Sequence, residues 1–146
     1  MIDPQSYRDI SIIIVDDDDV DVMAVKRSFK QLRVINPIHR ASNGFEALDI
    51  LRGTNGREKI PKPHLILLDI NMPMMNGIEF LEELRKDPDL QPTVVFILTT
   101  SDAEKDIVNA YSFNVAGYIV KSTVGSEFVD LMELIDSYWR LVQLPE

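Results

Sequence analysis

The chain has 146 residues and no cysteine, a length that suits one domain with a sizeable core and a composition that excludes a disulfide framework or thiol chemistry. Its 24 acidic residues outnumber 15 basic ones, and the net charge of −9 argues against non-specific binding to nucleic acid. Because no apolar run approaches roughly 18 residues and the N-terminus lacks a secretory pattern, we expect a cytoplasmic protein with no membrane contact.

The N-terminal third of the chain begins a strand and helix pattern. Residues 1–9 have the composition of a loose leader. The β-branched run Ile10–Val15 predicts a first strand, and four consecutive acids follow it at Asp16–Asp19. Asp18 or Asp19 is expected to cap the helix that comes next. The apolar positions of that helix recur at helical spacing: Val22, Val25, Phe29 and Leu32.

The middle of the chain continues the pattern. A weak second strand is predicted over Ile38–Ser42, and Asn43-Gly44 turns into a short helix. Residues 53–63 are rich in Gly, Pro and charged residues, which indicates an exposed loop. The four apolar residues of Leu65–Leu68 then predict a strand buried on both faces, as in the centre of a parallel sheet. This strand ends abruptly in a carboxylate, Asp69.

The C-terminal half supplies the remaining elements. A third helix carries Ile78, Leu81 and Leu84 and ends at Asp87-Pro88, before a fourth strand over Thr93–Leu98. A fourth helix is predicted to begin at Asp102 and to carry Ile107, Ala110 and Tyr111. A short fifth strand follows at Gly117–Val120, and the fifth and last helix is predicted over residues 126–142. Its apolar residues spread over about half of the helix circumference, more than one core-facing stripe requires. We therefore expect this helix to form an interface with another chain.

Five strands that alternate with helices predict an α/β fold, in which crossovers make the strands parallel and helices cover both faces of the sheet. We predict one domain over residues 1–146 with a flavodoxin-like (βα)5 doubly wound sheet in the order 2-1-3-4-5. Ligands of such sheets bind at the carboxyl ends of the strands. The acids Asp16 and Asp17 should therefore meet Asp69, Thr99 and Lys121 at one edge.

These residues suit the chemistry of phosphoryl transfer. Of three carboxylates within a few ångströms, at least one is pushed toward protonation unless a cation intervenes. Hard oxygen ligands with room for water suit Mg²⁺. Lys121 adds an ammonium group and Thr99 a hydroxyl. Together they would neutralise a phosphoryl group while the carboxylate of Asp69 attacks it, giving an acyl phosphate.

The same residues resemble the receiver domains of two-component response regulators over essentially the whole chain. The likeness lies in five ordered motifs at strand ends: the acid pair Asp16-Asp17, Leu-Leu-Asp69-Ile-Asn-Met-Pro73, Asn76-Gly77, Thr99, and Gly-Tyr-Ile-Val-Lys121. Any one of these motifs is common in unrelated proteins, whereas the ordered set of five is specific.

The resemblance implies that Asp69 accepts a phosphoryl group from the phosphohistidine of a sensor histidine kinase. It also implies a Mg²⁺ ion bound directly by Asp17, Asp69 and the backbone carbonyl of Asn71, with Asp16 acting through water. Lys121 would pair with the phosphate, while Thr99 and Tyr118 would move toward it as a conformational switch. The chain would then catalyse only its own phosphorylation and dephosphorylation, and otherwise would not be an enzyme.

Within the family, the segment Tyr138–Pro145 and the long loop near Gly56 look most like the small regulators paired with bacterial phytochromes. This likeness implies a phytochrome-type kinase as partner and a homodimer through the fourth helix, fifth strand and fifth helix. No output domain follows Lys121, so we expect the output to be a contact with another protein or a change in the dimer. The family usually has Lys-Pro where this chain has Lys121-Ser122.

Two other functions are compatible with parts of the sequence. Asp16-Asp-Asp18-Asp-Val20 also fits the opening motif of haloacid-dehalogenase-like phosphatases, with Asp16 as nucleophile and Asp18 as general acid. That superfamily has a later acid pair where this chain has Thr99–Ser101. The other alternative is a receiver-like interaction module that is never phosphorylated. A flavin-binding domain is disfavoured because no phosphate-binding Gly/Ser/Thr loop follows the first strand.

Overall fold

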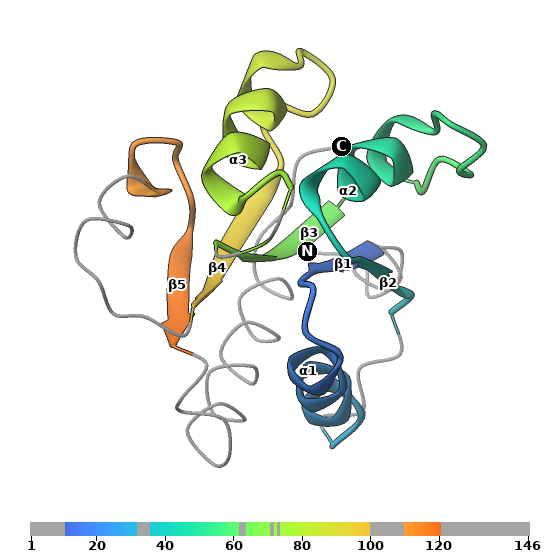
Figure 1. The fold of residues 1–146 in the computed structure, drawn as a ribbon, viewed down its shortest axis with the longest axis vertical. Helices are drawn as coiled ribbons and strands as arrows, with labels where there is room; N and C mark the ends of the chain where they lie inside the picture. The colour runs from blue at the N-terminus through green and yellow to red at the C-terminus, as the bar shows by residue number, and fades with distance from the viewer. Residues whose placement is uncertain are drawn as a thin grey trace, which may run out of the picture.

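The computed structural model describes residues 11–31, 36–61, 64–70, 72, 74–99 and 110–120. Five parallel strands form one sheet in the order β2-β1-β3-β4-β5, which confirms the predicted fold class and strand order (Figure 1). The strands are β1 Ser11–Val15, β2 Ile38–Ala41, β3 His64–Asp69, β4 Val94–Thr99 and β5 Gly117–Val120. The helices are α1 Asp19–Gln31, α2 Gly44–Arg52 and α3 Gly77–Lys86.

Helices cover both faces of the sheet, with α1 on one side and α2 and α3 on the other (Figure 1). As a result, every residue of the central strands β1 and β3 is buried. Successive side chains of a strand point to opposite faces, and Ile13, Val15, Ile66 and Leu68 belong to the same core cluster as the buried residues of α2 and α3. The continuous apolar runs that predicted double burial are therefore confirmed.

In each of the described helices, the N-cap side chain accepts hydrogen bonds from backbone N–H groups of the first turn. Asp18 caps α1, since its Oδ1 accepts from the backbone N–H of Val20 at 2.8 Å and of Asp21 at 3.3 Å. Asn43 caps α2, and Asn76 caps α3 in a reciprocal capping box with Glu79. The sequence predicted either Asp18 or Asp19 as the cap of α1, and in the structure Asp18 has that role.

The predicted boundaries shift by a residue at several strand ends. The second strand ends at Ala41 rather than Ser42, and the fourth runs from Val94 to Thr99 rather than from Thr93 to Leu98. The predicted leader and the predicted last helix over 126–142 lie outside the described residues. Among the described helices, none is both long and apolar enough to cross a membrane.

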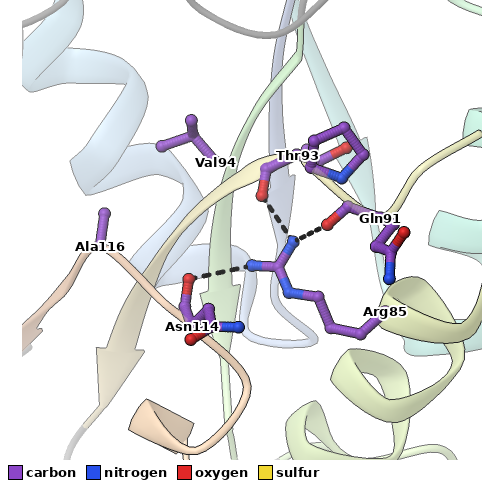
Figure 2. Close-up of a pocket in the computed structure, with 7 residues that line it drawn as sticks. Arg85, Gln91, Thr93, Val94, Asn114 and Ala116 are labelled. Atoms are coloured by element: carbon purple, nitrogen blue, oxygen red, sulfur yellow. Dashed lines mark hydrogen bonds between the residues drawn. The ribbon is translucent and has the colours of Figure 1, made fainter.

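Arg85, at the end of α3, ties together the loops that enter β4 and β5. Its guanidinium donates to the backbone carbonyls of Gln91 at 2.6 Å, Thr93 at 2.8 Å and Asn114 at 3.2 Å (Figure 2). It also donates to the carbonyl of Phe113 at 2.7 Å. Burial lowers the pKa of Arg85 from its usual value. The surface pocket of about 320 Å³ beside this arginine opens at the amino ends of the strands, opposite the predicted site.

Candidate metal and phosphoacceptor site

Three carboxylates meet at the carboxyl edge of the sheet, as the sequence predicted. Asp16 follows β1 directly and Asp69 is the last residue of β3; these strands pair with Val15 opposite Leu68. Asp16, Asp17 and Asp69 each offer a carboxylate oxygen, and these oxygens all lie within 4.8 Å of one another. Asp16 and Asp69 are buried, whereas Asp17 is exposed. Of the three carboxylates, that of Asp17 is the one open to solvent.

The loop from β1 to α1 turns Asp16 into the cluster. The N–H of Asp16 donates to the carbonyl of Ala41 at 3.0 Å, so pairing with β2 extends one residue beyond β1. The Oδ1 atom of Asp16 accepts from the backbone N–H of Asp18 at 2.9 Å, which closes a tight turn. The carboxylate of Asp18 caps α1 by accepting a hydrogen bond from the backbone N–H of Val20. The phosphatase alternative needs this same carboxylate as its general acid.

The loop after Asp69 is held against the start of α3. The N–H of Gly77 donates to the carbonyl of Ile70 at 2.9 Å. A Cβ atom at Gly77 would lie 2.7 Å from both the carbonyl oxygen of Asp69 and the Cα of Ile70. Only glycine permits this approach, so α3 can begin directly against the backbone of the predicted phosphoacceptor.

The two predicted switch residues lie on the strands next to β3. Thr99 is the last residue of β4, one position beyond the residue that pairs with Asp69. Tyr118, in β5, pairs in register with Ile97. Tyr118 is 42% exposed, and its ring meets that of Tyr111 edge to face at a centroid distance of 6.4 Å. The structure therefore holds Tyr118 facing solvent, with Tyr111 as its neighbour.

Two residues of the predicted site lie outside the described residues. They are Lys121, which follows the last residue of β5, and Asn71, two positions after Asp69. The peptide bond between Lys121 and Ser122 is also outside them. Their predicted roles remain predictions.

The donor set suits a hard divalent cation. Three carboxylate oxygens within 4.8 Å can share one ion, and oxygen ligands with an open side for water suit Mg²⁺ and Mn²⁺ rather than zinc. Asp16 and Asp69 are buried, and buried carboxylates that stay ionised need a compensating positive charge. The residues present therefore fit a divalent metal site.

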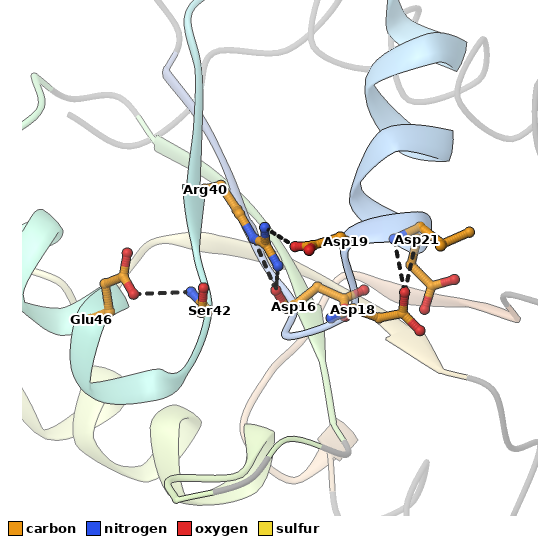
Figure 3. Close-up of polar contacts among 8 residues, drawn as sticks. Asp16, Asp18, Asp19, Asp21, Arg40, Ser42 and Glu46 are labelled. Atoms are coloured by element: carbon orange, nitrogen blue, oxygen red, sulfur yellow. Dashed lines mark hydrogen bonds and ion pairs between the residues drawn. The ribbon is translucent and has the colours of Figure 1, made fainter.

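Sequence reasoning missed two residues that shape this site. Arg40, on β2, donates to the backbone carbonyl of Asp16 and forms an ion pair with Asp19 (Figure 3). Gly77 was noted for its place in a turn motif, but not for its contact with the backbone of Asp69. The strand order already placed β2 beside β1, and this was the one signal in the sequence that pointed to Arg40.

Comparison with known proteins gives a consistent result. Residues 12–133 match the response regulator receiver domain family. The response regulator Rcp1 of a Synechocystis species is 33% identical over 135 residues, which cover 92% of both chains.

Solved structures of the same kind also match. The Mn²⁺-bound form of Rcp1 has a TM-score of 0.82 and 32% identity, covering 93% of this chain and 99% of that one. The phosphorylated cyanobacterial phytochrome response regulator RcpA has a TM-score of 0.83 and 31% identity, covering 93% and 98%. Both the family match and these relatives span most of the chain, so the chain belongs to the response regulator receiver family.

Proposed function

We propose that this chain is a phosphorylation-dependent response regulator in which Asp69 accepts a phosphoryl group from a sensor histidine kinase. The observation that carries the proposal is the cluster of Asp16, Asp17 and Asp69, with their carboxylate oxygens within 4.8 Å of one another at the carboxyl ends of β1 and β3. The relative RcpA is described as phosphorylated, which supports the same chemistry here.

In the reaction, a carboxylate oxygen of Asp69 attacks the phosphorus atom of the phosphohistidine. A P–O bond forms to Asp69, the P–N bond breaks, and its electron pair leaves with the imidazole of the kinase. Asp69 is buried, so few waters compete with it for the phosphorus. In this proposal the chain's only chemistry is the gain and loss of its own phosphoryl group.

A bound Mg²⁺ would neutralise charge on the phosphoryl oxygens during transfer. Asp17, Asp69 and the backbone carbonyl of Asn71 would hold it directly, with Asp16 acting through water. Asp17 is exposed whereas Asp16 and Asp69 are buried, so water would complete the coordination of the ion from the side of Asp17. The relative Rcp1 is described in a Mn²⁺-bound form, which supports divalent cation binding by this chain.

Phosphorylation would act through the residues next to Asp69. The ammonium group of Lys121 would pair with the new phosphate, and the hydroxyl of Thr99 would hydrogen-bond to it. Tyr118 would then leave its exposed position beside Tyr111 and turn inward. This change would shift a two-state equilibrium of the surface from the fourth helix to the fifth.

The kinase is expected to be of the phytochrome type, since RcpA is described as a cyanobacterial phytochrome response regulator. We also propose that the chain forms a homodimer through its fourth helix, fifth strand and fifth helix, with the broad apolar surface predicted for residues 126–142 as the main contact. The output would be a contact with another protein or a change in this dimer.

Incubation with acetyl phosphate and Mg²⁺ followed by intact-mass analysis tests this function. The wild-type chain should gain one phosphoryl group, and EDTA should abolish the gain. Asp69→Asn should gain none, while keeping the fold because the amide has the same shape. Equal labelling of Asp69→Asn would contradict the proposal. Loss of labelling in Asp16→Asn together with retention in Asp69→Asn would instead favour the phosphatase alternative.

A further inference from the structure

Arg40 reaches from the edge strand of the sheet to the loop that carries two of the three clustered acids. It lies on β2 opposite Ile14 of β1. Its Nε and Nη2 atoms donate to the backbone carbonyl of Asp16 at 3.3 and 3.2 Å. Its Nη1 atom forms an ion pair with Asp19, the first residue of α1 (Figure 3).

These contacts fix the peptide unit between Asp16 and Asp17. The backbone N–H of Asp16 is held by the carbonyl of Ala41 at 3.0 Å, and its carbonyl is held by Arg40. The carbonyl of Asp16 and the N–H of Asp17 belong to one planar unit. Strand β2 therefore sets the direction in which the chain leaves Asp16 and the position of the Cα of Asp17.

The cluster needs such a restraint because its members repel one another. Three carboxylates within 4.8 Å favour any movement that separates them. Asp69 is held by its strand and by Gly77, but Asp17 is exposed and lies in a loop. Groups that orient the ligands of a metal from outside contribute strongly to its affinity.

We propose that Arg40 is a positioning residue for the divalent cation, which holds the Asp16–Asp17 peptide so that both carboxylates stay directed at Asp69. This inference rests on the metal binding in the proposed function. The ion pair with Asp19 does not carry the effect, since Asp19 is 80% exposed and surface pairs contribute little. The effect passes through the hydrogen bonds to the carbonyl of Asp16.

The sign of the effect separates this role from simple electrostatics. Removing a positive charge close to a cation site should tighten cation binding by Coulomb's law. Loss of the positioning role should weaken it. The double variant Arg40→Met/Asp19→Asn removes one positive and one negative charge, so it tests the hydrogen bonds at unchanged net charge. Asp19→Asn alone keeps those hydrogen bonds and serves as the matched control.

The experiment is calorimetric titration of the full chain with MgCl₂ and with MnCl₂ at pH 7 and 0.15 M salt. We expect about tenfold weaker binding for Arg40→Met and for the double variant, and a change below about twofold for Asp19→Asn. The loss of metal affinity in Arg40→Lys should lie between these tenfold and twofold changes. One ammonium group cannot replace the two guanidinium nitrogens that donate to the carbonyl of Asp16. Arg40→Lys also keeps the test valid if Arg40→Met does not fold.

Two further readouts exclude a merely structural role. Thermal unfolding in EDTA should leave the variants close to the wild type, whereas the stabilisation by saturating Mg²⁺ should shrink. The Mn²⁺ electron paramagnetic resonance spectrum of the loaded variants should broaden as the ligand geometry loosens. Equal or tighter binding by Arg40→Met and the double variant would overturn the inference. If the wild type binds neither ion, the metal site of the proposed function fails as well.

Discussion

Gly77→Ala should destabilise the protein because its new methyl group would collide with backbone atoms. The added Cβ would lie 2.7 Å from the carbonyl oxygen of Asp69 and 2.7 Å from the Cα of Ile70. Backbone atoms at the end of a buried strand cannot rotate away as a side chain can. Either α3 or the carboxyl end of β3 must move, and the second movement displaces the predicted phosphoacceptor.

Gly44→Ala is a closely matched control. Gly44 and Gly77 are each the first residue of a helix and each follows an asparagine cap. At Gly44 the new Cβ would meet the Cγ and Sδ atoms of Met75 at 2.7 Å, and these belong to a flexible side chain. Both variants gain about 0.4–1 kcal/mol from the stiffer unfolded chain. The difference between them therefore reports the collision with the backbone.

Forcing extra volume into a packed region costs about 1–3 kcal/mol when the surroundings must shift. After subtraction of the gain from the stiffer unfolded chain, we expect a net loss of about 0.5–2 kcal/mol for Gly77→Ala. For Gly44→Ala, where the nearest atoms belong to a flexible side chain, we expect a net loss below about 0.5 kcal/mol. With a urea m-value of about 2 kcal/mol/M, the midpoint of Gly77→Ala should fall by about 0.3–1 M. Urea unfolding followed by circular dichroism measures this. Equal midpoints for the two variants would mean that the backbone around Gly77 accepts a methyl group as easily as the Met75 side chain does.

Three further predictions follow from named contacts. Arg85→Lys should lower the free energy of unfolding by about 2 kcal/mol, measured by urea unfolding, since an ammonium group cannot reach the four carbonyls that Arg85 binds. Asn76→Ala should cost about 1 kcal/mol in the same assay because the capping box of α3 is lost, and Asn76→Asp should recover most of it. For Asp87, partial burial acts to raise the pKa, but hydrogen bonds from the N–H of Asp89 and from Arg52 outweigh it, so the pKa is lowered. The stabilisation by Asp87 should therefore be full above about pH 4 and lost as the pH falls through the lowered pKa, and the stability gap to Asp87→Asn should close over that range.

The fold was predictable because its strongest signals are local. The apolar runs of β1 and β3 leave no polar face for solvent, so they indicate central strands covered by helices on both sides. The acids at their ends then fall at one edge. Strand ends were less predictable. Thr93 and Ser42 each adjoin a strand and were predicted to belong to it, but neither lies in the part of the strand that pairs with its neighbours in the sheet.

Of the site, only the clustered carboxylates were predictable from the sequence. Carboxylates at strand ends are visible in the sequence, and Asp16, Asp17 and Asp69 do cluster. The supporting contacts depend on distances between segments, which no local pattern encodes. Arg40 and Asp16 are 24 positions apart, and the closeness of Gly77 to the backbone of Asp69 follows from how α3 packs on β3. The inward turn of Tyr118 on phosphorylation stays a prediction, and its exposed position here is the starting point for that movement.

Chemical mapping of the unmutated protein shows which carboxylate carries the phosphoryl group, and we expect it to be that of Asp69. An acyl phosphate is reduced by borohydride to an alcohol, which converts a phosphorylated aspartate to homoserine. After treatment with acetyl phosphate and Mg²⁺, then borohydride, peptide sequencing by mass spectrometry should find homoserine at position 69. Homoserine at position 16 or 17 instead, or at none of the three, would contradict the account.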